Sequence, residues 1–517
     1  DIAPRLDRHR GQPGDLAGRH GVERALSGLL CESVDMVSGN KICLSRNEVD
    51  FRLPGRLPIH WARFYSSALS ADGMLGLGWR TAWDVTLRRR DDNRLDYIDE
   101  QGRIVSLPMP ERGYQIIVSS EQLHVARLPD DRIVVADLTP RYTVFGEFDE
   151  HGVARIKYVE DLGRRRVGCI WDGGRLLRMR GTCGHELRMH YGRDGSRLTG
   201  IECVDGGPTG FLVRYGYDKH GRLAEVRNRL GDVVRGFAYD DSGRMVEEIG
   251  PLRQTMRYTW QTIGGASRVV ERSTCRGARE HCTYELAERS TQATDVFGHT
   301  AHWQYDARGR VLAYVDFDGR RYAFQYDNAG WPSELTLPGE RRVSVVNDNL
   351  GRPIREEAPL SGERLTVYAF ASREPLSIRL QDGRTWLWQR DDELRPTQFQ
   401  SPSDGVTQTT YSEQDGVQVR TDTHEQRGAV VLEYDGRGLV SKRTDAAGRT
   451  VIYRRDGNGH VVAVTDPFGA VTQIEPDLLG RPLTVTLPDG RQERRIWNAA
   501  GQLTTSTGLD GQARHWH

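Results

Sequence analysis

Short apolar runs alternate with polar turns at a fixed spacing along most of this chain. Glycines mark the turns, and in the last third of the chain they arrive alternately 10 and 11 residues apart. The step of 21 residues appears in two interleaved sets, Gly438, Gly459, Gly480 and Gly501, and Gly448, Gly469, Gly490 and Gly511. One interval holds a strand of about six residues and a turn of about four, so 21 residues predict one β-hairpin.

The runs between the glycines have the composition of strands. Residues 310–316 read R-V-L-A-Y-V-D and residues 460–466 read H-V-V-A-V-T-D, which are rich in β-branched and aromatic residues and too short for helices. No helical period is sustained after about residue 30. A fixed period of this kind is typical of wound repeat architectures. We therefore expect an all-β fold in which hairpins form one continuous curved ribbon.

The length of the ribbon limits its shape. About 46 strands at about 4.8 Å each give a ribbon on the order of 220 Å long. Wound once, it would make a ring roughly 70 Å across, and wound more tightly a little over one turn of a narrower tube. Either shape is a wall and not a closed container.

Most clear repeats have a Tyr–Asp pair before the turn, and all have a glycine three residues after the aspartate. Aspartate at this position accepts hydrogen bonds from backbone N–H groups two residues on, and glycine supplies the positive φ that the turn needs. We interpret these residues as structural repeat positions: Tyr217, Asp218, Gly221, Tyr239, Asp240, Gly243, Tyr305, Asp306, Gly309, Tyr326, Asp327, Gly330, Tyr434, Asp435, Gly438, Asp456, Gly459, Asp477 and Gly480.

A catalytic interpretation of the same residues is weaker. Glycoside hydrolysis needs one pair of carboxylates at a set separation, whereas these aspartates recur once per hairpin. The tyrosines could form a stripe on which sugars stack, but a cross-strand aromatic ladder that packs the wall explains them more simply. We therefore predict no catalytic, cofactor-binding or metal-binding residue in this chain.

Charge and cysteine content narrow the class of protein. The 72 Lys and Arg residues balance the 72 Asp and Glu residues, so nothing points to nucleic acid or to an acidic membrane surface. No apolar run approaches the roughly 18 residues of a membrane span. Seven cysteines without CxxC spacing fit folding in a reducing cytoplasm. Cys275, His281 and Cys282 come nearest to a metal-ligand cluster, and we interpret them as ordinary residues.

The repeat divides the chain into three predicted segments. Residues 1–30 are polar and rich in Arg and Gly, with one or two helical turns expected over 22–30, and are interpreted as a linker or docking tail. Residues 31–150 form a β module without the 21-residue step, and residues 151–517 carry the repeats. Between about 355 and 430 the repeat degenerates, and residues 390–396 form a unit that lacks its glycine. The first residue is Asp1 and the last strand is cut off at its start, so we expect a piece of a longer protein.

At these residues a family resemblance is clear. The unit Y-D-x-x-G-R, at 217–222, 239–244 and 305–310 with variants at 326–331 and 434–439, resembles the tyrosine–aspartate repeat of the Rhs/YD-repeat family. Teneurins and insecticidal toxin complexes share this unit. The stretches V-D-M-V-S-G-N (34–40), D-F-R-L-P-G (50–55), W-A-R-F-Y-S-S (61–67) and G-L-G-W-R (76–80) more narrowly resemble the module that opens bacterial Rhs polymorphic toxins.

That resemblance implies a β cocoon, a hollow shell of wound hairpins around a C-terminal toxin made in the bacterial cytoplasm and then secreted. It implies as partners the rest of the shell, the enclosed toxin, PAAR/VgrG-type spike proteins of type VI secretion and an adaptor chaperone, with an immunity protein acting on the toxin. The family's PAAR domain, aspartate-dependent self-cleavage motif and toxin are not in this sequence. A surface adhesion or carbohydrate-binding protein and a glycan-acting enzyme are the alternative functions.

Overall fold

Strands make up almost all of the regular structure of this chain. The computed structural model describes residues 30–31, 33–207, 209–414 and 416–516. Within these ranges there are 49 strands and a single 3-10 helix of three residues, η1 (Ser119–Glu121). The all-β prediction is confirmed. Of the helical turns expected over 22–30, all but the last residue lie outside the described residues, and Leu30 begins strand β1.

The strands fall into an N-terminal group and a long consecutive series. The first group is β1 (Leu30–Cys31), β2 (Val34–Asp35), β3 (Ile42–Cys43), β4 (Val49–Leu53), β5 (Ile59–Ser66), β6 (Asp72–Gly73), β7 (Gly76–Leu77) and β8 (Trp79–Thr81). The series begins with β9 (Thr86–Arg89), β10 (Arg94–Ile98), β11 (Ile104–Pro108), β12 (Gln115–Val118), β13 (Leu123–Arg127), β14 (Ile133–Ala136), β15 (Arg141–Phe145), β16 (Val153–Asp161), β17 (Arg166–Asp172), β18 (Arg175–Gly181), β19 (Glu186–Tyr191), β20 (Leu198–Asp205), β21 (Gly210–Tyr217), β22 (Leu223–Arg227), β23 (Val233–Tyr239), β24 (Met245–Ile249), β25 (Thr255–Ile263), β26 (Ala266–Thr274), β27 (Arg279–Glu285) and β28 (Ser290–Asp295). It continues with β29 (Thr300–Tyr305), β30 (Val311–Val315), β31 (Arg321–Tyr326), β32 (Pro332–Leu337), β33 (Arg341–Asn347), β34 (Pro353–Ala358), β35 (Gly362–Tyr368), β36 (Pro375–Leu380), β37 (Thr385–Arg390), β38 (Pro396–Ser401), β39 (Gly405–Gln414), β40 (Val417–His424), β41 (Gly428–Tyr434), β42 (Val440–Thr444), β43 (Thr450–Arg455), β44 (Val461–Thr465), β45 (Val471–Pro476), β46 (Pro482–Thr486), β47 (Gln492–Trp497), β48 (Leu503–Thr507) and β49 (Ala513–His515).

The series from β9 to β49 forms one long antiparallel sheet, which we call the wall. From β12 onward each strand pairs with the next strand in sequence, so the sheet is a ribbon of hairpins. Strand β9 pairs with β10 and also with residues 153–155 of β16. The predicted division at residue 150 lies between β15 and β16 and stays a prediction.

The ribbon winds with a constant offset between its turns. Gln122 donates a hydrogen bond to the carbonyl of Leu350 at 2.6 Å, 228 residues away, and Arg165 bonds Glu393 at 2.8 Å, again 228 residues away. The loop between β16 and β17 therefore meets the loop between β37 and β38, which is 21 strands further on. The same step of 21 strands brings the β22–β23 loop to the β43–β44 loop.

An odd number of strands per turn brings opposite edges of the ribbon together. Successive hairpin loops alternate between the two edges of an antiparallel ribbon. A step of 21 therefore places a loop at one edge of the first turn against a loop at the opposite edge of the second, so the two turns stack edge to edge. At about 4.8 Å per strand such a turn is roughly 30 Å across. The winding is tighter than the expected single ring or little more than one turn.

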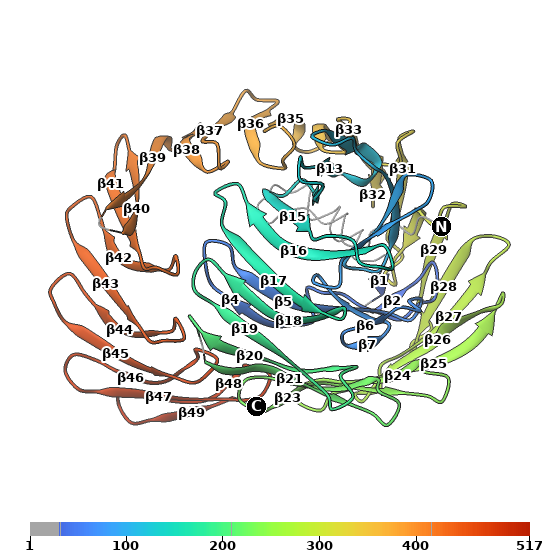
Figure 1. Ribbon diagram of the computed structural model, residues 1–517, viewed down its shortest axis with the longest axis horizontal. Helices are drawn as coiled ribbons and strands as arrows, with labels where there is room; N and C mark the ends of the chain where they lie inside the picture. The colour runs from blue at the N-terminus through green and yellow to red at the C-terminus, as the bar shows by residue number, and fades with distance from the viewer. Residues whose placement is uncertain (1–29, 32, 208, 415, 517) are drawn as a thin grey trace.

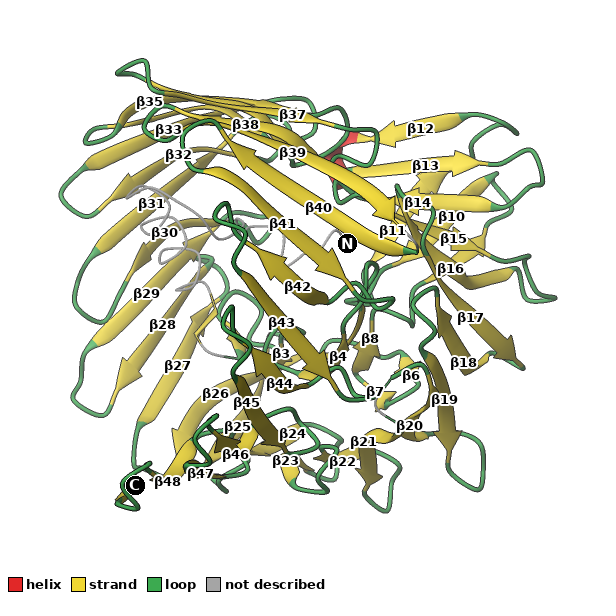
Figure 2. Ribbon diagram, turned by 90° about the vertical axis from the view of Figure 1, so that its left-hand side faces the viewer, coloured by secondary structure: helices red, strands yellow, loops and turns green. Residues whose placement is uncertain are grey.

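The N-terminal group lies inside this winding. Residues 33–85, which we call the N-terminal module, carry β2 to β8, and Figures 1 and 2 show these strands enclosed by the wall. Buried Leu53, Ile59 and Trp61 of the module share one apolar core with wall residues such as Leu187 and Phe237. The module therefore packs on the wall as part of one folded unit.

Candidate functional site: the inner face and its charged contact with the N-terminal module

Every predicted repeat aspartate lies in its own hairpin turn. The Oδ1 atoms of Asp218, Asp240, Asp306, Asp327, Asp435, Asp456 and Asp477 accept hydrogen bonds of 2.8–3.0 Å from backbone N–H groups two or four residues later. The following glycines, Gly221, Gly243, Gly309, Gly330, Gly438, Gly459 and Gly480, have φ between 73° and 90°. The aspartates thus occupy separate turns and do not converge on one pocket.

Tyrosines of the repeat reach back across the sheet. Tyr326 Oη donates to the carbonyl of Val311 at 2.8 Å, and Tyr239 Oη donates to that of Leu223 at 2.9 Å. The arginine that ends the preceding unit lies over the ring, with the Arg310 guanidinium 4.6 Å from the centre of the Tyr326 ring. The units of Tyr239 and Tyr326 are therefore tied to the unit before them by a hydrogen bond and a cation–π contact.

The unit without a glycine keeps the same geometry with other residues. Asp391 Oδ1 accepts hydrogen bonds from the N–H groups of Glu393 and Arg395, at 3.0 and 2.9 Å. Leu394 stands at the glycine position with φ of 59°, and Arg390 replaces the tyrosine by donating to the carbonyl of Pro375 at 3.1 Å. The turn survives because the aspartate and the backbone pattern are retained.

Strand register identifies which side chains face the interior. Paired residues of neighbouring antiparallel strands lie on the same face of the sheet. Tyr258 of β25 contacts the module, and the pairing leads from it through Trp303 to Trp388 and Phe399 of the second turn. The Trp388 and Phe399 rings lie 5.2 Å apart and are half-buried. The inner face therefore carries aromatic side chains beyond the area that the module covers.

Aromatic residues of the module dock on this face through buried polar atoms. Trp61 Nε1 donates to Tyr215 Oη at 2.9 Å, and Tyr215 Oη donates to Asp50 at 2.6 Å. Trp79 Nε1 donates to Tyr239 Oη at 3.0 Å. Because buried indole N–H and phenol groups need partners, these contacts fix the position of the module as well as covering apolar surface.

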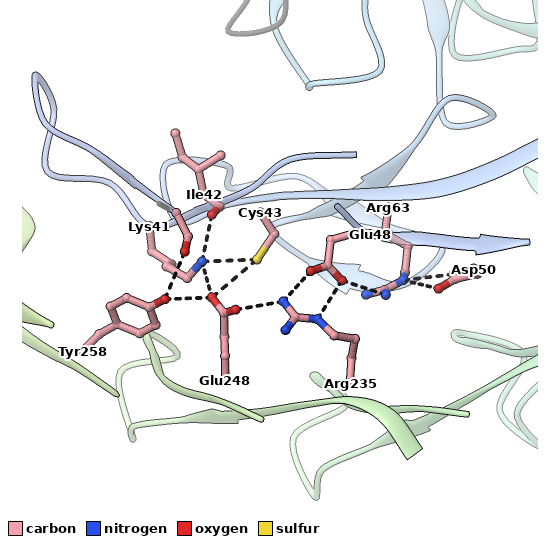
Figure 3. A network of polar contacts seen from close by, with 10 residues as sticks. Lys41, Ile42, Cys43, Glu48, Asp50, Arg63, Arg235, Glu248 and Tyr258 are labelled. Carbon is pink, nitrogen blue, oxygen red and sulfur yellow. Dashed lines mark hydrogen bonds and ion pairs between the residues drawn. The ribbon is translucent and has the colours of Figure 1, made fainter. Parts of the chain in front are cut away.

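A chain of alternating charges continues the contact (Figure 3). Arg235 of the wall binds Glu48 of the module and also Glu248 Oε2, the latter at 2.8 Å. Arg63 donates to Glu48 Oε2 at 2.8 Å and to both oxygens of Asp50 at 3.0 Å. The side chains of Arg63, Glu48 and Asp50 are at most 2% exposed.

Lys41 lies at the other end of this row of alternating charges, next to Glu248. Its Nζ forms an ion pair with Glu248, donates to the carbonyl of Ile42 at 2.8 Å, and lies 5.1 Å from the centre of the Tyr258 ring. Tyr258 Oη donates to Glu248 Oε1 at 3.0 Å. Three cations, Lys41, Arg63 and Arg235, thus balance three carboxylates, Glu48, Asp50 and Glu248.

The protonation states in this network follow from its pairing. Burial alone would raise the pKa of Glu248, but Lys41 and Arg235 lower that pKa to about 2. Burial would lower the pKa of Lys41, whereas neighbouring Cys43 and Glu248 hold that pKa above its ordinary value. Burial raises the pKa of the Cys43 thiol to about 12. The lysine is thus charged and the cysteine protonated, which suits ion pairing and not nucleophilic attack.

The sequence did not single out this network. Lys41 and Glu248 are 207 positions apart, and neither belongs to a motif of its own. The one signal in the sequence is the scarcity of lysine, since Lys41 is one of only four lysines among the 72 Lys and Arg residues.

Within the described part of the chain, no group of three or more His, Cys, Asp and Glu residues is placed to hold a metal ion. Cys282 is buried and Cys275 is exposed, while His281 lies on the opposite face of β27 from Cys282. None of the described helices is long and apolar enough to span a bilayer.

Two family models match this chain. One is described as "RHS Repeat" and matches residues 208–255, 305–342 and 434–471. The other is described as "Domain of unknown function (DUF6531)" and matches residues 31–107, which include the N-terminal module. The repeat matches cover the turns whose aspartates, glycines and tyrosines are described above. The chain carries RHS repeats at these three places.

Two curated relatives of this chain are named toxins. It is 35% identical over 304 residues to the double-stranded DNA deaminase toxin A of Burkholderia cenocepacia, covering 57% of this chain and 21% of that protein. It is 27% identical over 469 residues to the toxin protein Tse5 of Pseudomonas aeruginosa, covering 81% of this chain and 35% of that protein. The chain therefore spans between about a fifth and a third of the length of these two relatives.

Solved structures of toxin complexes are similar at a low level. The Photorhabdus luminescens Tc holotoxin pore with a mutated TccC3 matches with a TM-score of 0.43 and 12% identity, over 88% of this chain and 29% of that one. A TcdB2-TccC3-Cdc42 complex matches with a TM-score of 0.42 and 13% identity, over 95% of this chain and 31% of that one. TM-scores this low do not by themselves establish a common fold.

Proposed function

We propose that this ribbon is the wall of a container that sequesters a toxin polypeptide until it is delivered to a competing bacterial cell. The observation that carries the proposal is the inner face, which register traces without interruption from the module contact into the second turn. Its aromatic side chains could make many weak contacts with an enclosed chain without a specific binding site. In this role the wall needs no catalytic residue of its own.

The family supports the same function. Two relatives that share much of this segment are named toxins, and this chain spans only 21% and 35% of their lengths. In the proposal the remaining length supplies further wall and the toxin, while spike proteins of the type VI secretion system and an adaptor chaperone carry the whole to the target cell. An immunity protein would act on the toxin and not on this segment.

The test compares substitutions on the two faces of one strand in the full parent protein. Replacing Trp388 and Phe399 by glutamate places charges on the inner face at a register pair. The matched control replaces Leu387 and Gln400, the adjacent pair on the outer face, by glutamate. Limited proteolysis of the downstream region reports containment, and circular dichroism reports whether the wall is intact.

The proposal expects the inner pair to expose the downstream region to protease while the outer pair leaves it protected. Equal protection in both variants would contradict it, and so would a downstream region that stays soluble and protected after residues 31–517 are removed. Turnover of a glycan by purified 31–517 would replace containment with the enzyme alternative.

A further inference from the structure

The tip of the β4–β5 hairpin reaches the line where the two turns of the wall meet. This tip, residues 54–58, joins two module strands whose adjoining residues Leu53 and Ile59 are buried in the shared core. A Cβ built on Gly55 would lie 3.0 Å from Cys183 Sγ in the β18–β19 loop of the first turn. The hairpin tip therefore contacts the first turn at its edge.

The same tip contacts two loops of the second turn. A Cβ on Gly438, in the β41–β42 loop, would lie 3.1 Å from Arg56 Cγ and 3.3 Å from Arg56 N. A Cβ on Gly459, in the β43–β44 loop, would lie 3.8 Å from Pro54 Cγ. Glycine at both positions leaves room for the hairpin to lie between the edges of the two turns.

Two hydrogen bonds of Arg229 join the turns directly in this region. Arg229 Nη2 bonds Asn458 Oδ1 at 3.2 Å, and Arg229 Nη1 bonds the carbonyl of Leu478 at 3.2 Å. Leu478 is 46% exposed, so the second of these bonds lies near solvent. Solvent-exposed polar contacts contribute little to holding two surfaces together, whereas the hairpin is anchored by fully buried apolar residues.

We infer that the β4–β5 hairpin is a latch that holds the second turn against the first. The seam between the β20–β23 edge and the β41–β44 edge stays closed while the module sits on the inner face, and it opens when the module moves. This device goes beyond containment and can be tested without any cargo, so its failure would leave the proposed function standing.

A disulfide staple tests the latch on the purified chain. The Cβ of Gly55→Cys would lie 3.6 Å from Cys183 Cβ, which is within the range of disulfides, and the φ of Gly55 lies outside the left-handed region. Oxidised glutathione takes two electrons and two protons from the two thiols as the S–S bond forms. The Gly55→Cys variant with Cys183→Ser cannot form the bond and is the matched control.

Hydrogen exchange at residues 435–438 and 456–459 is the readout, because the new bond joins the hairpin to the first turn and not to these second-turn loops. The latch expects their exchange to slow by about tenfold on oxidation. Residues 445–448, at the opposite edge of the same strands, should not change. Slower exchange confined to 54–58 and 181–185 would overturn the inference.

A second variant tests the latch in the opposite direction. Pro54→Gly with Arg56→Ala removes the side chains that face Gly459 and Gly438 and leaves the buried anchors Leu53 and Ile59 in place. Exchange at 435–438 and 456–459 should then rise by about tenfold or more, again without change at 445–448. If the two loops exchange as in the parent chain, the hairpin is not what holds the seam.

Discussion

Replacing Gly438 by alanine should destabilise the protein through two separable effects. The φ of Gly438 is 79°, where an L-residue costs about 1 kcal/mol or more. The added Cβ would also lie 3.1 and 3.3 Å from two atoms of Arg56, closer than ordinary contact. Overpacking of this kind adds on the order of 1 kcal/mol, so we expect a total loss of about 2 kcal/mol.

Two other glycines separate these effects. Gly469 has φ of 85° with no heavy atom within 4 Å of a built Cβ, so Gly469→Ala should cost only the backbone strain of about 1 kcal/mol. Gly436 has neither a positive φ nor a neighbour within 4 Å, and Gly436→Ala should change stability by less than about 0.5 kcal/mol.

Urea unfolding followed by tryptophan fluorescence measures all three variants, and native-state hydrogen exchange at 435–439 checks the local effect. Exchange is needed because long repeat arrays do not have to unfold in one step. Equal losses for Gly438→Ala and Gly469→Ala would refute the contact with the hairpin. No loss in either variant would refute the turn geometry itself.

Three further predictions concern the network and the repeat. Glu248→Gln leaves Lys41 buried without its ion pair and should cost about 3–5 kcal/mol in urea unfolding. The pKa of Glu248 is lowered from 4.5 to about 2, so its contribution to stability is complete above about pH 4.5 and is lost as the pH falls towards 2. The free energy of unfolding should therefore fall less over this pH range in the Gln variant than in the parent chain. Tyr326→Phe removes the hydrogen bond to Val311 and should lower the unfolding free energy by about 1 kcal/mol, whereas no shift in the urea midpoint would exclude a stabilising tyrosine ladder. Asp477→Ala should cost about 1–2 kcal/mol and speed exchange of its own turn, which Asp477→Asn would partly restore.

A balanced network of buried charges is an unusual way to join two parts of one chain. Replacing such a network with apolar residues is often neutral or stabilising, so its charges do not by themselves explain the stability of the contact. They do make the contact specific, because Glu48 can meet Arg235 and Lys41 can meet Glu248 in one register only without leaving a buried charge unpaired. The apolar core between module and wall supplies the larger share of the stability.

The 21-residue period determined the hairpin, the turn and the all-β class, because these depend on residues within a few positions of one another. Asp435 and Gly438 can form their turn wherever the ribbon runs. Even the degenerate unit with Leu394 follows the rule, since its aspartate and backbone keep the pattern. Local chemistry of this kind is readable from a single sequence.

The winding and the contact with the module were decided only by the tertiary structure. Nothing in a repeat of 21 residues states that 21 strands complete a turn, since that number depends on small twists added over the whole sheet. Lys41 meets Glu248, and Arg165 meets Glu393, only because the ribbon closes on itself at that pitch. The same curvature creates an inside and an outside, and so makes one face of every strand an inner face.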